Sequence, residues 1–200
     1  ANFADADLEG ADFSGARLGG ANFDGANLAG VNVERMGLPR SVLAKAVTDP
    51  SPEAIARVPQ IREEVERGHA WVTTNGKAGQ PGRLDGLDLR PAADLFRNRL
   101  MIGLSAKGVL AIGIDFSDSE LAGANFDGAD LRACNFKGAD LRGASFRGAK
   151  LTHAALAQAN IGPLPLRDGS SRPTVFEDAM LDGTGIVLPA PPAHLDQLLA

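Results

Sequence analysis

Residues 124–138 read ANFDG ADLRA CNFKG, and the chain opens with the same pattern as ANFAD at 1–5, ADLEG at 6–10 and ADFSG at 11–15. Each five-residue unit contains a small residue, Asn or Asp, Leu or Phe, a variable residue and usually Gly. Side chains on one face recur every 3.6 residues in a helix and every 2 residues in a strand, so neither element explains this spacing. One short unit cannot bury its own apolar residue. The repeat therefore predicts units that stack on one another around a continuous core.

The central Leu or Phe of each unit is the predicted core residue. One run keeps five-residue spacing over 3–33, and a second keeps it over 116–161. The pattern returns at Phe176, and the register is kept because 161 and 176 are three units apart. The predicted core residues are Phe3, Leu8, Phe13, Leu18, Phe23, Leu28, Phe116, Leu121, Phe126, Leu131, Phe136, Leu141, Phe146, Leu151, Leu156, Ile161, Phe176, Leu181 and Ile186.

These units resemble the pentapeptide-repeat family. The resemblance implies an all-β solenoid, a right-handed quadrilateral β-helix with one repeat on each side and four repeats in each coil. Residues twenty apart would then stack at the strand spacing of about 4.8 Å. Phe126 is expected to stack with Phe146, and Phe116 with Phe136 on the opposite side.

The repeat stops at Met36, and residues 36–83 are predicted to form a helical spacer or insertion. A short helix is expected at 41–47, and a second one begins near Pro52, is broken or kinked at Pro59 and resumes over 60–73. The stretch HAWV at 69–72, with the glycines that follow it, resembles a lead-in to bacterial pentapeptide arrays. That resemblance implies a helix, including Trp71, that caps the first coil of a second array.

The predicted domains are therefore coils at 1–35, the spacer at 36–83, a second β-helix at 84–188 and a tail at 189–200. Residues 92–113 keep no single register in this interpretation. Two architectures remain open: two β-helices joined by the spacer, or one continuous β-helix interrupted by it. Two stacks are favoured, because the segment that resembles a lead-in indicates that a new array of coils begins after it.

Two segments outside the repeats are candidates for contacts. Residues 163–173 are rich in Pro, Gly and Ser, and the repeat resumes after them, which predicts a loop inserted at one corner of the stack. The tail is predicted to be a Pro-rich linker followed by a short helix. An open solenoid end exposes unpaired backbone, so this helix would cap the last coil or join a second molecule in an end-to-end homodimer. The apolar residues available for either role are Leu195, Leu198 and Leu199.

Charge excludes some classes of partner. The net charge is −5, and no segment is basic enough to bind nucleic acid directly. No apolar run approaches the roughly 20 residues that span a bilayer.

Acidic residues of the early coils should lie beside a basic band, with Asp127 next to Arg147 and Asp130 next to Lys150. This band either neutralises its acidic neighbours or docks a protein partner, and it comprises Arg132, Lys137, Arg142, Arg147 and Lys150.

The sequence offers little for catalysis. Its three histidines are scattered, no His–Cys cluster has metal-ligand spacing, and no Gly-rich phosphate loop follows a strand. The single cysteine, Cys134, is expected to be a packed thiol and is compatible with a reducing cytosol. We therefore expect no cofactor, no metal and no enzymatic activity.

The leading hypothesis is a bacterial, cytoplasmic interaction scaffold that contacts an unidentified protein through 36–83 and 163–173. A branch of the resembled family implies an alternative, a DNA mimic that inhibits or protects DNA gyrase. A third alternative is a structural spacer or cap within a larger repeat protein.

Overall fold

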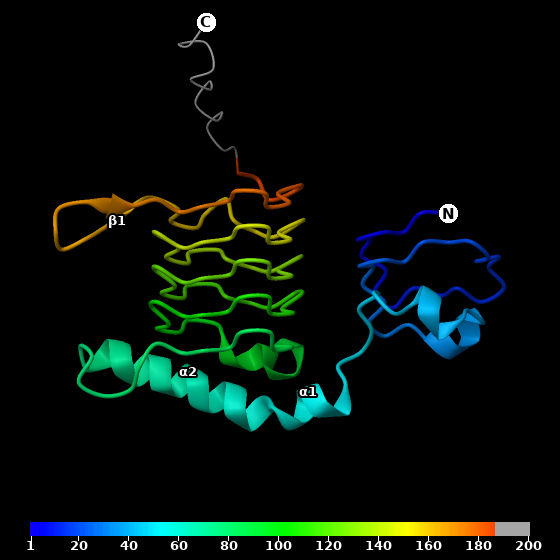
Figure 1. Ribbon diagram of the computed structural model, residues 1–200, viewed down its shortest axis with the longest axis horizontal. Coiled ribbons are helices and arrows are strands. Elements are labelled where there is room, and N and C mark those ends of the chain that lie inside the picture. The colour runs from blue at the N-terminus through cyan, green and yellow to red at the C-terminus, as the bar shows by residue number, and fades with distance from the viewer. Residues whose placement is uncertain (187–200) are drawn as a thin grey trace, which may run out of the picture. The chain divides into compact units, whose positions relative to one another are not determined.

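The computed structural model describes residues 1–186, which fall into two compact units, one over Ala1–Glu53 and one that begins at Ala54. Each unit contains stacked coils (Figure 1). The predicted tail residues Leu195, Leu198 and Leu199 lie outside the described residues.

Coils of twenty residues stack in the second unit. Parallel bridges join Leu100 to Glu120, Glu120 to Asp140 and Asp140 to Asn160. At one such position the N–H of Asp140 donates to Ser119 at 2.9 Å, and the N–H of Leu141 donates to the carbonyl of Asn160 at 2.8 Å. Each side of a coil pairs through a single Asn/Asp-type position, which is too short for an extended strand. The repeats therefore fold as layers of isolated bridges, as Figure 1 shows.

The corners between sides require a left-handed backbone. Gly128 and Gly138 have φ of 66° and 71° there. Ala133 and His153 occupy the equivalent position with φ of 55° and 62°. Glycine adopts this conformation without steric cost, which explains why it ends most units.

Two Phe stacks fill the core of the second unit. Phe116 and Phe136 stack with ring centroids 5.1 Å apart, and the rings of Phe126 and Phe146 are 5.3 Å apart. The two stacks meet edge to face, with Phe126 and Phe136 at 6.1 Å and 75°. Stacking of the predicted Phe pairs is thus confirmed, and offset or edge-to-face ring contacts of this kind are favourable.

The other predicted core residues are buried or partly buried in both units. Those from Phe116 to Leu156 are buried, as is Phe176. Ile161, Leu181 and Ile186 are partly buried and pack against the same cluster. In the first unit Leu18, Phe23 and Leu28 are buried, and three residues are partly buried against them: Phe3, Leu8 and Phe13.

The expectation that residues 92–113 keep no single register is wrong from Phe96 onward. The central positions continue through Met101, Ala106 and Ala111, all buried. The position two residues earlier, which is small elsewhere, holds the large buried side chains Leu104, Val109 and Ile114. Large and small side chains have exchanged places in the pairs Leu104–Ala106 and Val109–Ala111, so the backbone repeat is kept although the sequence pattern is lost.

The first coil of this unit is longer than the others. Arg83 pairs with Ser105 and Asp88 with Leu110, a spacing of 22 residues instead of 20. The extra residues lie in the 3-10 helix η3 (Arg90–Leu95), where Pro91 sits in the first turn. Phe96, directly after η3, rejoins the column of Phe116 with ring centroids 5.3 Å apart.

Two helices precede the coils of the second unit. Helix α1 spans Pro52–Ala56 and α2 spans Val58–Thr73. The expected break near Pro59 is confirmed, because α1 ends at Ala56 and α2 begins at Val58. Pro59 lies in the first turn of α2, where it lacks only an N–H that would be unpaired anyway. Ile61 and Val65 of α2 are buried in the same cluster as Leu84. Helix α2 therefore covers the first coil.

In the first unit, Asn2 pairs with Asn22, and Asp7 with Asn27. Two 3-10 helices follow, η1 (Val33–Met36) and η2 (Arg40–Val42). The expected helix at 41–47 is wrong, because Val47 pairs with Asn27 and its N–H donates to Ala26 at 2.8 Å. Backbone pairing to the coil thus extends the first unit beyond Met36, and the predicted spacer 36–83 is divided between the two units.

The segment 163–173 forms a hairpin. Strand β1 (Leu164–Pro165) pairs antiparallel with β2 (Ser171–Arg172). The two coil bridges that enclose it in the sequence, Ser145 to Val175 and Lys150 to Met180, span 30 residues instead of 20. The hairpin is therefore a ten-residue insertion in a stack that otherwise keeps its spacing.

Candidate functional site

The hairpin lies against one corner of the coils, where glycines leave room for it. A Cβ atom at Gly143 would approach the Cβ of Leu164 to 2.7 Å and the Nε of Arg172 to 3.1 Å. A Cβ atom at Gly123, one coil earlier, would collide with the guanidinium of Arg172. Alanine at Gly143 would therefore displace the hairpin, whereas alanine at Gly123 would displace the end of the Arg172 side chain. These glycines therefore make the seat on which it packs.

Thr174 anchors the base of the hairpin. Its hydroxyl donates to the carbonyl of Leu141 at 2.8 Å and accepts the N–H of Gly143 at 3.0 Å. The tip is closed by the N–H of Leu166, which donates to Ser170 at 2.8 Å. The Asp168 carboxylate accepts the hydroxyl and the N–H of Ser170 at 2.6 and 3.0 Å. These bonds, the hydroxyl first, lower the pKa of Asp168.

The C-terminal end of α2 contributes a second surface. The N–H of Gly76 donates to Trp71 at 2.8 Å, and the hydroxyl of Thr74 donates to Ala70 at 2.6 Å. These bonds fold the chain back at the helix end, and Gly76 adopts a φ of 81°. Figure 1 shows that this end of α2 and the hairpin extend past the coils on the same side of the second unit.

A pocket of about 270 Å³ lies between these elements. Ile102, from the first regular coil, contributes an apolar side chain to it, and Arg167, from the hairpin tip, contributes a cation. The side chains of Trp71, Asn75 and Arg167 have no hydrogen-bond or ion-pair partner among residues 1–186. The residues from the end of α2 and the turn after it are Trp71, Val72, Asn75 and Gly76.

Trp71 was predicted to help cap the first coil, but it does not belong to the core cluster. It is half-buried and lines the pocket, whereas Ile61 and Val65 carry the contact between α2 and the core. The four-residue spacing of Ile61 and Val65 was the available signal for this buried helix face.

The predicted basic band does not form one surface. Arg132, Lys137, Arg142 and Arg147 are five residues apart, so they fall on four successive sides of the coils. Lys150 lies at the paired position above Asp130, the second position of its unit, whereas the others occupy the fourth. A partner approaching one side would meet only part of the band.

Two arginines of the band are held by an acid two residues earlier. The guanidinium of Arg132 donates to Asp130 at 2.8 and 2.6 Å, and its side chain is only 6% exposed. Arg142 holds Asp140 at 2.9 and 2.6 Å, which lowers the pKa of that carboxyl and raises that of the guanidinium. Asp88 and Arg90 repeat the arrangement at 2.7 Å. The motif Asp-Leu-Arg thus predicts a local ion pair, a signal that the sequence analysis missed.

Asp127 lies next to Arg147 as predicted, but the two side chains form no ion pair. The Arg147 guanidinium contacts Glu177 at 3.1 Å, while Asp127 accepts the backbone N–H of Arg147 at 3.0 Å. The Asp127 carboxylate is occupied by this backbone N–H, and the Arg147 guanidinium instead reaches Glu177 on the next coil. Lys137 is exposed and lines a shallow pocket of about 210 Å³ with Ala155 and Gln158.

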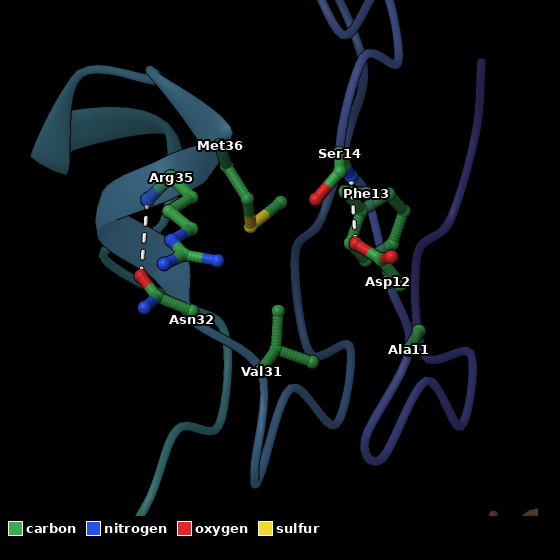
Figure 2. Close-up of a pocket in the computed structure, with 8 residues that line it drawn as sticks. All are labelled: Ala11, Asp12, Phe13, Ser14, Val31, Asn32, Arg35 and Met36. Atoms are coloured by element: carbon green, nitrogen blue, oxygen red, sulfur yellow. Dashed lines mark hydrogen bonds between the residues drawn. The ribbon is translucent and has the colours of Figure 1, made fainter.

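A small pocket of about 60 Å³ occurs in the first unit, between Ala11–Ser14 and Val31–Met36 (Figure 2). The coils part here because η1 replaces a repeat. Met36 reaches from η1 towards Phe13 and Ser14, and Asp12 accepts the N–H of Ser14 at 2.8 Å. Hydrogen bonds from Ser14 lower the pKa of Asp12. The pocket is a gap left by imperfect stacking, with room for little more than solvent.

Cys134 is buried, and its thiol donates to the carbonyl of Ala111 at 2.9 Å. Burial raises the pKa of this thiol well above its ordinary value. Within the described part of the chain, no three His, Cys, Asp or Glu side chains gather in a way that could hold a metal ion. None of the helices there combines the length and apolarity needed to cross a bilayer.

Comparison with known proteins identifies the repeat. The family model described as Pentapeptide repeats matches in eight copies, over residues 1–35, 107–138 and 124–161. This chain belongs to the pentapeptide-repeat family. The matched ranges contain both predicted runs of central Leu and Phe residues, over 3–33 and 116–161.

Solved pentapeptide-repeat proteins are similar to this chain at low identity. One from the thylakoid lumen of Arabidopsis thaliana is 24% identical over 44% of this chain and 64% of its own length, with a TM-score of 0.30. One from the cyanobacterium Cyanothece 51142 is 19% identical, covering 52% and 67%, with a TM-score of 0.24. HetL, a Nostoc protein involved in heterocyst differentiation regulation, is 25% identical, covering 94% and 66%, with a TM-score of 0.21.

The pentapeptide-repeat chain spans about two thirds of the length of these structures. A search of curated proteins finds no significant match to its sequence.

Proposed function

We propose that this pentapeptide-repeat protein is a non-catalytic scaffold that binds a protein partner through the hairpin 163–173 and the end of α2. The observation that carries the proposal is the hairpin itself. It adds ten residues to a stack that keeps its spacing, and its tip helps to form the 270 Å³ pocket. A loop carried on a regular framework is the usual place for recognition, because it can vary without disturbing the core.

We infer that the framework is a right-handed quadrilateral β-helix. The twenty-residue bridges and the corner every five residues support four sides in each coil. The close-packed Phe stacks support a rigid body that holds the hairpin and α2 at fixed separation.

The side chains of the described residues fit a non-catalytic role. His69 and His153 lie on different elements, one in α2 and one at a coil corner. Cys134 is a poor nucleophile because it is buried and its thiol is kept protonated. We place the scaffold in a bacterial cytoplasm, where an unpaired cysteine is stable.

The alternative function, mimicry of duplex DNA, is less well supported. A DNA mimic needs a continuous acidic surface to face a basic channel. On these coils Asp88, Asp130 and Asp140 are each neutralised by an adjacent arginine. A titration of gyrase supercoiling activity addresses this alternative, and inhibition at low micromolar protein would favour it over the scaffold.

Site-specific cross-linking tests the scaffold. A photoreactive residue placed at Leu166, which is 41% exposed at the hairpin tip, should capture one protein from an extract of the source organism. The matched control carries the same residue at Lys107, an exposed coil position away from the hairpin. A product specific to position 166 supports the proposal. Equal products from both positions, or none from either, would exclude the hairpin as the contact site.

A further inference from the structure

We propose that the pocket between α2 and the hairpin recognises a carboxylate on an acidic peptide segment of the partner, next to an apolar side chain. This inference rests on the proposed function and specifies the chemistry of the ligand. The donors, the charge and the size of the pocket support it.

The pocket brings together donors that lack acceptors. The indole N–H of Trp71 and the guanidinium of Arg167 have no hydrogen-bond partner among residues 1–186, and both residues line the pocket. The amide of Asn75 adds a third donor without a partner in the same set. Asn75 and Arg167 are exposed, so these donors are open to an incoming ligand. Indole and guanidinium groups donate and never accept, so they favour a ligand that supplies acceptors. A carboxylate is the protein group that best matches a guanidinium.

The charge of the hairpin tip agrees with an anionic ligand. Arg167 is the residue of the tip that reaches the pocket, and its neighbour Asp168 does not line it. The Asp168 carboxylate is already engaged by the hydroxyl and N–H of Ser170. Arg172 of β2 adds a second positive charge on the same hairpin. Two arginines and one aspartate give the hairpin a net charge of +1, and Arg167 is the charged residue of the pocket lining that an entering carboxylate would meet.

The remaining lining is apolar. Val72, Ile102 and the ring of Trp71 form these walls. A free inorganic anion would leave them exposed, whereas a peptide can place a Leu or Phe side chain against them. A volume of about 270 Å³ lies just below the range for drug-sized ligands, so it suits one or two side chains better than a cofactor.

The chain supplies its own reporter for this pocket. Trp71 is the only tryptophan, and the chain has no tyrosine, so intrinsic emission excited at 295 nm comes from the pocket alone. A ligand that excludes water from the indole should shift that emission and reduce its quenching by acrylamide. No label needs to be introduced.

The test titrates the full chain with blocked tripeptides of sequence LDF, LEF, FDL and FEL. The matched probes replace the acid with its amide, as in LNF and LQF. We expect saturable shifts with at least one acidic peptide, binding at least tenfold weaker for its amide partner, and weaker binding at higher salt. Acetate alone should bind more weakly than the acidic peptides.

Two variants locate the interaction. Arg167→Gln should weaken acidic-peptide binding at least tenfold and leave the emission of the free protein near that of the wild type. Arg147→Gln, which removes an arginine that does not line the pocket, should bind as the wild type does. Equal binding of acid and amide peptides, no binding of either, or equal effects of the two variants would overturn the inference.

The two proposals fail separately. If position 166 captures a partner but the peptides do not discriminate acid from amide, the scaffold stands and the carboxylate inference is wrong. If the acidic peptides bind at Arg167 but position 166 captures nothing, the pocket is an anion-binding site and the scaffold proposal is wrong.

Discussion

Phe146 stacks on Phe176 with ring centroids 5.1 Å apart and planes 3° from parallel, although thirty residues separate them. Phe126 and Phe146, twenty residues apart, stack at 5.3 Å and 8°. The contact is the same whether or not the hairpin 163–173 intervenes. The hairpin is therefore accommodated entirely outside the core.

Deleting residues 164–173 should leave the stack intact. The deletion joins Pro163 to Thr174 and restores the twenty-residue spacing between Ser145 and Val175. We expect the free energy of unfolding to change by less than about 1 kcal/mol, because a shorter connection costs little closure entropy. Urea unfolding followed by circular dichroism measures this. A loss of several kcal/mol would show that the hairpin supports the core.

Phe136→Ala should be strongly destabilising. Its ring is fully buried and contacts those of Phe116, Phe126 and Phe146. We expect a loss of about 3–5 kcal/mol from removed contacts and the cavity left behind. Thermal and urea unfolding provide the measurement. Lys137→Ala at the next, exposed position should unfold as the wild type does; an unchanged Phe136→Ala variant would contradict this packing.

Leu104→Ala tests the exchange of large and small side chains in the early coils. The equivalent position one coil later is already alanine, Ala124, so a uniform repeat would tolerate the change. Here Leu104 is 1% exposed beside the small central residue Ala106. We expect a loss of about 2–5 kcal/mol by chemical denaturation. A neutral result would mean that the central position, and not Leu104, fills this layer.

Acid should weaken the ion pair between Asp140 and Arg142. The hydrogen bonds and charge of Arg142 lower the pKa of Asp140 in the folded protein. The resulting stabilisation is complete above the unfolded pKa of about 3.9 and is lost as pH falls through the lower, folded value. Arg142→Gln should reduce the stability difference between pH 6 and pH 2. Wild type and variant with identical pH profiles would show that the pair contributes nothing.

The sequence predicted the coils wherever residue size follows the repeat. Phe116 to Leu156 could be placed because Leu or Phe marks each central position. Residues 96–114 could not, because the core needs only the summed volume of facing side chains. Ala106 with Leu104 satisfies that need as well as Phe126 with Ala124 does. A sequence pattern shows only which side chains recur, whereas the coil is defined by the backbone and can continue when the side-chain pattern changes.

The candidate site was predicted only in its parts. The Pro- and Gly-rich composition at 163–173 indicated an insertion, and HAWV at 69–72 indicated a helix before the coils. Their convergence at Ile102 depends on the corner glycines Gly123 and Gly143, which look like any other repeat glycine in the sequence. Long-range placement of a hairpin follows from the steric room at these glycines, which no local pattern encodes.

Helix α2 makes the two ends of the second unit different, because it covers the end that begins at Leu84. Ile61 and Val65 occupy the space into which another coil would have to pack below Leu84. That end can neither gain a coil nor template a foreign strand, since its core is already covered. Changes in the number of coils must therefore arise beyond this helix. Helix α2 is thus the fixed end of the second unit, and the position of each later coil and of the hairpin follows from it.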